Sequence, residues 1–241
     1  MNKNLAIIPA RGGSEGIVDK NIKEFAGKPL IAWTIELAKS CDLIDRVIVS
    51  TDSEDIASIS ERYGAEVPFL RPRELSSSEV AIEPVISHAY SHLKDSENYQ
   101  ADSIILLFPT NPLRQKKHIQ ESLALFNSKD FDSVISVNES PAHYTPYWTL
   151  IKNKGGKVTY FDGTNLDNGY KRRQDFPEIC FAKNDLIFIF KPENILQKEA
   201  AMYGQAIELY ETDILYSGDI NSEEDWDLTL SIFKKLHKHN N

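Results

Sequence analysis

The fold class is decided by Leu5-Ala6-Ile7-Ile8-Pro9 and by the polar loop that follows it, Ala10-Arg11-Gly12-Gly13-Ser14-Glu15-Gly16-Ile17-Val18-Asp19-Lys20-Asn21. Residues 5–9 are apolar throughout, which is typical of a short strand buried on both faces of a sheet. A helical segment then begins at Pro29, where a proline suits the first position because its missing N–H would be unpaired there. A buried strand, a glycine-bearing loop and a helix form the first half of a βαβ unit.

The same alternation continues to residue 137. Further strands are predicted at 46–50, 66–70, 103–107 and 133–137. Helices are predicted at 29–39, from Asp52 or Ser53 to 63, at 84–93 and at 117–126. Strands separated by helices predict an α/β fold with a mostly parallel, Rossmann-like nucleotidyltransferase sheet that is flanked by helices.

The alternation of predicted strands and helices is interrupted between residues 139 and 184. Prolines and glycines there separate short strand-like pieces at 147–151 and 157–160, which predicts a hairpin-rich insertion. Strands at 186–190 and 206–210 and a helix at 222–236 then complete the core. We therefore expect one domain over residues 1–241, with 139–184 as an inserted arm that makes dimer contacts or acts as a lid.

Composition narrows the class of protein. With 27 Lys and Arg against 36 Asp and Glu, the 241-residue chain has a formal charge of −9, which argues against nucleic-acid and anionic-membrane partners. The apolar run at 5–8 is too short for a signal sequence, and no run could span a bilayer. The two cysteines, Cys41 and Cys180, cannot form a disulfide framework, so we expect a cytoplasmic protein with structural cysteines.

The glycine loop is the main candidate site. Ligands of open α/β sheets bind at the carboxyl ends of the strands, where this loop lies. Glycines let the backbone approach an anion, and Arg11 and Lys20 add positive charge, a combination that suits a triphosphate. The loop matches neither the P-loop nor the dinucleotide-binding spacing. A flexible surface turn is the alternative.

These residues resemble the opening signature of the acylneuraminate cytidylyltransferases, the CMP-sialic acid synthetase family. The resemblance runs in order along nearly the whole chain, through 7–21, 27–31, 45–52, 63–72, 106–114, 173–174, 176–177 and 219–225. It implies transfer of CMP from CTP to a 2-keto sugar acid, with release of pyrophosphate and dependence on Mg²⁺. It also implies a homodimer.

The resemblance assigns roles to individual residues. Nucleotide contacts are implied for Ala10, Arg11, Gly12, Gly13, Ser14, Lys20, Asn21 and Arg71, with Thr51 and Asp52 bordering the pocket. Acceptor contacts are implied for Phe108, Arg173, Gln174 and Phe181. Catalysis would depend on Arg11, Lys20 and Asp219, through positioning and neutralisation of phosphate charge.

An acidic cluster near the C-terminus has two interpretations. If residues 219–221 are extended, Asp219 and Asn221 share one face and can offer oxygens to Mg²⁺. Alternatively, Ser222 caps the following helix and the acids after it favour the first helical turn. The family has a second aspartate where this chain has Asn221, a change that should weaken metal binding. Excess acids such as Asp225 could also serve the metal.

Other departures from the family concern the substrates. Glu15 replaces a lysine in the phosphate loop and would repel a nearby phosphate by about 3 kcal/mol at 5 Å and a dielectric near 20. Phe108 and Trp148 replace a glutamine and a lysine that reach the sugar, which indicates a less hydroxylated acceptor. The resemblance favours Arg173 as a residue that pairs with the carboxylate of the sugar acid or makes a contact across a dimer.

Three functions remain open. The first is CMP transfer to a sialic-acid-like 2-keto acid. The second is the same chemistry on an eight-carbon keto acid or a phosphonate, and the third is a nucleotide-binding protein with little or no catalysis, which Glu15 and Asn221 would favour. His88 and His92 have the spacing of a metal pair but lack a third ligand, so we do not expect a zinc site.

Overall fold

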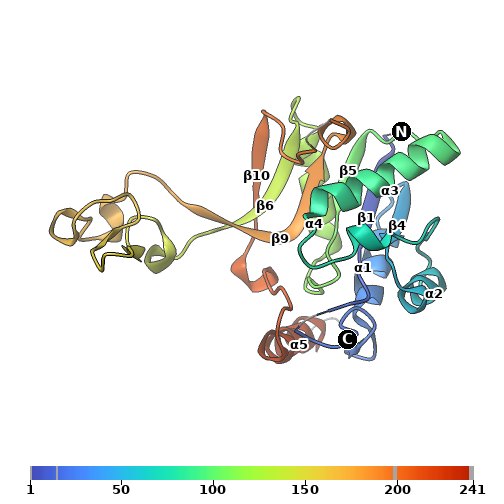
Figure 1. Ribbon diagram of the computed structural model, residues 1–241, viewed down its shortest axis with the longest axis horizontal. Coiled ribbons are helices and arrows are strands. Elements are labelled where there is room, and N and C mark those ends of the chain that lie inside the picture. The colour runs from blue at the N-terminus through green and yellow to red at the C-terminus, as the bar shows by residue number, and fades with distance from the viewer. Residues whose placement is uncertain (1, 15, 198–199, 239–241) are drawn as a thin grey trace.

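The structure is a computed structural model that describes residues 2–14, 16–197 and 200–238. Its centre is a six-stranded sheet in the order β10-β6-β9-β5-β1-β4 (Figure 1). These strands are β1 Asn4–Pro9, β4 Arg46–Ser50, β5 Ser103–Leu106, β6 Ser133–Glu139, β9 Phe181–Phe190 and β10 Ile207–Glu211. Strands β1, β4 and β5 are mutually parallel, as are β6 and β10, while β9 runs antiparallel between β5 and β6. The predicted mostly parallel α/β sheet is therefore confirmed.

Five α-helices and several short elements complete the described part of the chain. The helices are α1 Leu30–Lys39, α2 Glu54–Arg62, α3 Ile82–Glu97, α4 Lys116–Phe126 and α5 Glu223–Lys238. Two small hairpins pair β2 Glu24–Phe25 with β3 Lys28–Pro29, and β7 Leu150–Lys152 with β8 Val158–Tyr160. Single 3₁₀ turns lie at Arg73–Leu75, Ala142–Tyr144, Leu166–Asn168, Arg173–Asp175, Pro192–Asn194 and Ile214–Tyr216.

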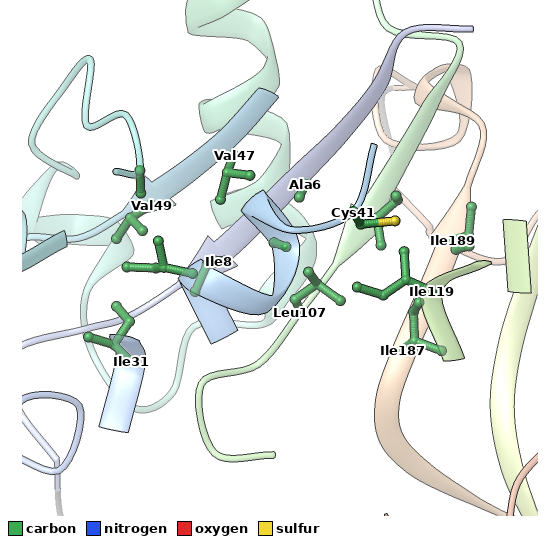
Figure 2. Packing of buried hydrophobic residues seen from close by; sticks show 14 of the residues in the cluster. Ala6, Ile8, Ile31, Cys41, Val47, Val49, Leu107, Ile119, Ile187 and Ile189 are labelled. Atoms are coloured by element: carbon green, nitrogen blue, oxygen red, sulfur yellow. The ribbon is translucent and has the colours of Figure 1, made fainter. Parts of the chain in front are cut away.

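The position of strand β1 explains why residues 5–9 are apolar throughout. Ala6 and Ile8 pack on one face of the sheet in the cluster that contains Ile31 of α1 and Ile119 of α4 (Figure 2). Leu5 and Ile7 point to the opposite face, where α3 covers them. Successive side chains of a strand alternate between faces, so a strand with helices on both sides needs apolar residues at every position.

The predicted strand at 66–70 is wrong. Only Glu66 pairs with the sheet, in a single parallel bridge to Ile48. Pro68 follows two residues later and has no N–H to donate to the ladder, so the pairing ends. The chain instead turns toward the end of β4, where the Arg71 N–H donates to the Thr51 carbonyl at 2.7 Å.

The segment 139–184 extends well beyond the sheet (Figure 1). It carries the β7–β8 hairpin, although residues 147–149 at the start of the predicted strand lie outside β7. Its base is built from a cluster of aromatic rings with centroids 5.0–5.9 Å apart, formed by Tyr147, Trp148, Tyr170 and Phe176. This part of the arm has its own small core, since none of these side chains belongs to the buried clusters of the sheet.

Helix α5 brings the C-terminal region to the glycine loop. Trp226 and Phe233 of this helix pack edge-on against Phe25, with ring centroids 5.3 Å away, and Ile17 and Ile220 belong to the same buried cluster. Residues that are about 200 positions apart in sequence therefore share one core, and this packing positions the site. In the described part of the chain, none of the helices combines the length and apolarity needed to cross a bilayer.

Candidate active site

A cavity of about 400 Å³ lies at the carboxyl ends of β1 and β5. Its wall combines the glycine loop, the end of β1, the chain after β5, the segment before α3 and the loop before α5. The lining residues are Pro9, Arg11, Ser14, Gly16, Lys20, Asn21, Arg71, Leu75, Ser77, Ser78, Val80, Ile82, Val85, Phe108, Pro109, Thr110 and Asn221. Three cations, Arg11, Lys20 and Arg71, face this space, which makes it suitable for a compact polyanion.

The glycine loop is held open by its own polar contacts. The side-chain amide of Asn21 donates to the Arg11 carbonyl at 3.1 Å. The Gly12 N–H donates to Asp52 Oδ1 at 2.9 Å, so it is engaged and does not point into the cavity. Ala10 is buried, and its N–H donates to the Ser50 carbonyl at 2.9 Å. Ala10, Gly12 and Gly13 thus form the frame of the loop and do not line the cavity.

Asp52 and Thr51 stabilise the chain around the end of β4. Thr51 is fully buried, and its hydroxyl accepts the Ser53 N–H at 3.1 Å. Neither residue lines the cavity, although the sequence placed both at its border. Asp52 acts on the site indirectly, because its carboxylate holds the Gly12 N–H in place.

Gly16 marks the contact between the glycine loop and the acidic loop before α5. A Cβ atom at this position would lie 2.1 Å from the carbonyl oxygen of Asn221, far inside van der Waals contact. The two loops can therefore approach this closely only because residue 16 has no side chain. Glu15 itself lies outside the described residues.

Lys20 connects the same two loops. Its ammonium donates to the Ile220 carbonyl at 2.8 Å. Burial lowers the pKa of Lys20, nearby Asp219 opposes this shift, and Arg11 adds to it. A partly buried ammonium beside a second cation is stabilised by an incoming anion, which is the physical reason for it to bind phosphate.

Arg71 also lines the cavity and is almost fully buried. Its guanidinium donates to the Ser50 hydroxyl at 3.1 Å and also to the Ser50 carbonyl. Burial lowers the pKa of Arg71 to about 10, with Asp52 acting in the opposite direction. The side chain is thus fixed by the end of β4 and directs its remaining donors toward the cavity.

Asp219 and Asn221 are brought together within residues 217–222, a stretch that belongs to neither a helix nor a strand. The Asn221 amide donates to Asp219 Oδ2 at 2.7 Å, and the Asn111 amide donates to Oδ1 at 3.2 Å. The facing side chains result from the loop that α5 and Lys20 hold in place. Two neutral amides therefore orient one carboxylate at the edge of the cavity.

This group fits a divalent cation. The Asp219 carboxylate and the amides of Asn111 and Asn221 carry hard oxygens. Within the residues that the structure describes, Asn111 Oδ1 is buried without a hydrogen-bond partner, and a cation or a water molecule would satisfy such an acceptor. In the same residues no cluster of three His, Cys, Asp or Glu side chains could form a full cage, so phosphate and water oxygens would complete the shell.

Asp225 takes part in the cap at the start of helix α5. Its carboxylate accepts the N–H groups of Asn221 and Ser222 at 3.0 and 2.9 Å, and its own N–H donates to the Ser222 hydroxyl at 3.2 Å. This reciprocal arrangement is a capping box. These backbone donors also lower the pKa of Asp225. The capping interpretation is confirmed.

A smaller cavity of about 220 Å³ adjoins the first and shares Phe108 and Ile82 with it. Phe108 therefore stands at the boundary between two spaces. The lining of the smaller cavity is Ile82, Glu83, Leu106, Phe108, Ile135, Ser136, Lys183, Asp185, Ile187, Phe188, Met202 and Tyr203. This wall is largely apolar, with a few charged groups.

The remaining predicted acceptor residues lie on the arm, away from both cavities. Arg173 and Gln174 line a separate hollow of about 670 Å³ at the base of the arm. Phe181 is more than one-third exposed at the start of β9. Trp148 donates from its indole N–H to the Tyr170 carbonyl at 2.8 Å, inside the aromatic cluster. Within one chain, these residues do not join the nucleotide cavity.

Several site residues were missed from the sequence. Ser77 and Ser78 come from a run of serines between two predicted elements, and Asn111 lies in the loop after β5, which ends at Leu106. The carboxyl end of a strand was the available signal for Asn111. The His88 ring lies edge-on and the His92 ring lies tilted against Phe69, with centroids 4.8 and 4.9 Å away, and the two histidines form no metal cluster with other described residues. Both cysteines are free.

A sheet of this topology, with a cationic cavity and a hard-oxygen group at its strand ends, defines an α/β protein of the nucleotidyltransferase class. Comparison with known proteins gives the family. Residues 5–238 match the model of the cytidylyltransferase family, and the chain belongs to that family.

Its relatives include proteins of similar and of greater length. The chain is 33% identical to the post-translational flagellin modification protein B of Campylobacter coli, covering 98% of this chain and 97% of that protein. It is 31% identical to a CMP-N,N'-diacetyllegionaminic acid synthase of Campylobacter jejuni, with 94% and 93% covered. It is 33% identical to the N-acylneuraminate cytidylyltransferase of Escherichia coli over 98% of this chain, but spans only 53% of that protein.

Solved structures support the fold. The chain superposes on a CMP:2-keto-3-deoxy-manno-octonic acid synthetase with a TM-score of 0.70 at 17% identity, covering 97% of this chain and 99% of the other. At this identity the likeness concerns the fold alone.

Proposed function

We propose that this protein transfers CMP from CTP to a sialic-acid-like 2-keto sugar acid and releases pyrophosphate. The observation that carries the proposal is the meeting of Lys20 with the loop of Asp219 at the edge of a cavity of nucleotide size. Membership in the cytidylyltransferase family and the named activities of its relatives support it. We also propose a cytoplasmic location, which the free cysteines support.

In the proposed reaction, an anomeric hydroxyl oxygen of the acceptor forms a bond with the α-phosphorus of CTP. The bond from that phosphorus to the bridging oxygen breaks, pyrophosphate leaves, and the hydroxyl proton is released. Arg11 and Lys20 neutralise the triphosphate, while Arg71 helps to hold the nucleotide. Bound Mg²⁺, held by Asp219 with amide oxygens of Asn111 or Asn221, would supply further charge neutralisation at the phosphates.

The acceptor space and the oligomer belong to the same proposal. The small cavity beyond Phe108 adjoins the nucleotide cavity and is placed to take part of an acceptor. Arg173 and Gln174 lie on the arm, too far out to line the cavities of their own chain. We therefore propose a homodimer in which the arm meets the partner, and its exposed Ile179 and Phe161, 66% and 61% accessible, supply apolar surface for that contact.

The proposal is tested by pyrophosphate release with CTP, Mg²⁺ and a panel of nine-carbon keto acids. Turnover with at least one acid and with CTP, but not with ATP, is expected. Absence of turnover with every acid, despite CTP binding by calorimetry, would instead support a nucleotide-binding protein without catalysis. Eight-carbon acids in the same panel test the other acceptor class.

A further inference from the structure

Arg114 is an arginine in the interior of the protein, with only 4% of its surface exposed. It ends the loop after β5, in which Phe108, Pro109 and Thr110 line the nucleotide cavity. A charged side chain is rarely buried to this extent unless a group of opposite charge pairs with it. The partners of Arg114 therefore call for an explanation beyond packing.

The guanidinium donates hydrogen bonds to three acceptors on three different segments. Nη2 donates to the Phe108 carbonyl at 3.0 Å, Nη1 to the Thr34 hydroxyl of α1 at 3.4 Å, and Nε to the Leu186 carbonyl of β9. All three acceptors are uncharged, and no carboxylate of the described residues bonds to the guanidinium. Burial lowers the pKa of Arg114 to about 9, and the charge of Asp219 opposes this shift.

These bonds fix the conformation of the loop at residues 108–114. The Arg114 N–H donates to the Asn111 carbonyl at 3.3 Å, and the guanidinium returns to the carbonyl of Phe108, so the loop is closed on itself. The other two bonds tie the loop to α1 and β9. Arg114 does not line the nucleotide cavity, so it supports the loop from within the fold.

The same loop holds the chain that carries Asp219. The Ile220 N–H donates to the Thr110 carbonyl at 3.0 Å, and the amide of fully buried Asn111 donates to Asp219 Oδ1 at 3.2 Å. A shift of residues 108–111 would therefore move both contacts at once. Because misplacement of a reacting group by about 1 Å can reduce a rate a hundredfold, the position of this loop matters to the reaction.

We propose that Arg114 is a positioning residue, which holds residues 108–111 and, through them, the loop of Asp219 in the arrangement that CMP transfer requires. The inference rests on the proposed CMP transfer and its cation group, and it identifies the buried support of that group. A guanidinium suits this role because its donors point in several directions from one rigid plane. The ammonium of a lysine lacks that fixed geometry.

Two substitutions separate the charge of Arg114 from its geometry. Arg114→Met removes the charge and every donor of the side chain, whereas Arg114→Lys keeps the charge without the planar fork. We expect both variants to fold with a lowered melting temperature, because carbonyl groups lose their partners. Leu93→Ala is the matched control for lost stability, since it leaves a cavity in the core. Leu93 lies before β5, at the end of that strand away from the site.

Hydrogen exchange of the protein without ligands gives the first readout. Exchange of the Ile220 N–H reports its bond to the Thr110 carbonyl, and amides of loops exchange through local opening. We expect Arg114→Met to increase the exchange rate of the peptide that contains Ile220 at least about tenfold, whereas Leu93→Ala should leave it within about twofold. An unchanged exchange rate in Arg114→Met would overturn the inference.

Kinetics give the second readout. We expect kcat to fall at least about tenfold in Arg114→Met and less in Arg114→Lys, while Leu93→Ala keeps the wild-type kcat below its melting temperature. Mg²⁺ should strengthen CTP binding less in Arg114→Met than in the wild type, as measured by calorimetry. Added to Asp219→Asn, Arg114→Met should reduce kcat by less than it does alone, because both changes act through one group. Fully additive effects, or an unchanged kcat, would contradict the positioning role.

The exchange and binding measurements keep this result separate from the proposed function. If Ile220 exchange and Mg²⁺-dependent CTP binding both depend on Arg114 but no acid turns over, the proposed transfer fails and the positioning of the Asp219 loop by Arg114 stands. If an acid turns over with a kcat that is independent of Arg114, the positioning role fails and the transfer stands.

Discussion

The Lys20 ammonium donates a hydrogen bond of 2.8 Å to the carbonyl oxygen of Ile220, 200 residues later in the chain. This contact joins the glycine loop to the loop that carries Asp219 and Asn221. A bound triphosphate would therefore meet both loops as one preorganised surface, and preorganisation reduces the reorganisation needed at the moment of reaction.

Lys20→Met keeps the length of the side chain but removes its charge and its donor. We expect the Kd for CTP to rise at least about tenfold, because one charge-assisted contact contributes about 1.5–3 kcal/mol. CMP, with fewer phosphate charges, should be affected less. Calorimetry with both nucleotides measures the difference, and Lys157→Met on the exposed arm is the control. An equal loss for CMP and CTP would contradict the role of Lys20 at the outer phosphates.

Gly16→Ala should separate the two loops. The added Cβ would lie 2.1 Å from the Asn221 carbonyl oxygen, and overpacking of this kind costs about 1–3 kcal/mol. We expect the melting temperature to fall by several degrees and turnover to fall with it. Gly13→Ala is the matched control for stability, because its Cβ would meet no atom within 4 Å. Equal melting temperatures for the two variants would contradict the close approach.

Asp219→Asn tests the proposed cation group. We expect turnover to fall about a hundredfold or more, because transition-state charge stabilisation of this kind is worth several kcal/mol. Mg²⁺ should also cease to strengthen CTP binding, a readout that does not depend on turnover. Asp227→Asn, at an exposed position of α5, removes the same charge nearby and should leave both measurements unchanged.

Ile179→Asp tests the proposed dimer. Ile179 is 66% exposed on the arm, and a charge there would be costly to bury against a partner. We expect sedimentation to change from the mass of a dimer to the 27.4 kDa of one chain. Leu228→Asp, on α5 with 63% exposure, is the control and should remain dimeric. A monomeric wild type would refute the dimer directly.

The stability of the protein should depend on pH through His118. This histidine is buried, and its Nδ1 accepts the Gln115 N–H at 3.1 Å. Burial lowers the pKa of His118 from 6.5 to about 4, with Lys117 acting in the same direction. The unfolded chain therefore binds the proton first, so stability is complete above pH 6.5 and decreases as the pH falls toward 4. The slope is at most about 1.4 kcal/mol per pH unit for one proton.

His118→Asn keeps an acceptor near the Gln115 N–H but cannot titrate in this range. Denaturant unfolding between pH 4 and pH 7 should show a shallower pH dependence for this variant than for the wild type. His143→Asn, at an exposed position of the arm, should leave the slope unchanged. Identical slopes for His118→Asn and the wild type would contradict the assignment.

The sequence alone predicts most of the sheet, because a strand buried on both faces needs a continuous apolar run, as residues 5–8 of β1 and 104–106 of β5 show. It also identifies the glycine loop, since glycine and cationic residues at a strand end are a local pattern. It misplaces 66–70, where apolar character suggested a strand but Pro68 limits pairing to one bridge. Local propensity cannot decide which backbone donors find a partner.

Only the tertiary structure decides which protein groups meet at the site. It assigns the Gly12 N–H to Asp52 and brings Asn111 and Lys20 to the loop of Asp219. It also places the Arg114 guanidinium against α1 and β9, which no local sequence pattern indicated. These contacts join segments 40 to 200 residues apart. The sequence specifies these contacts only through the packing of the whole core. The alternation of strands and helices, in contrast, follows from local sequence patterns.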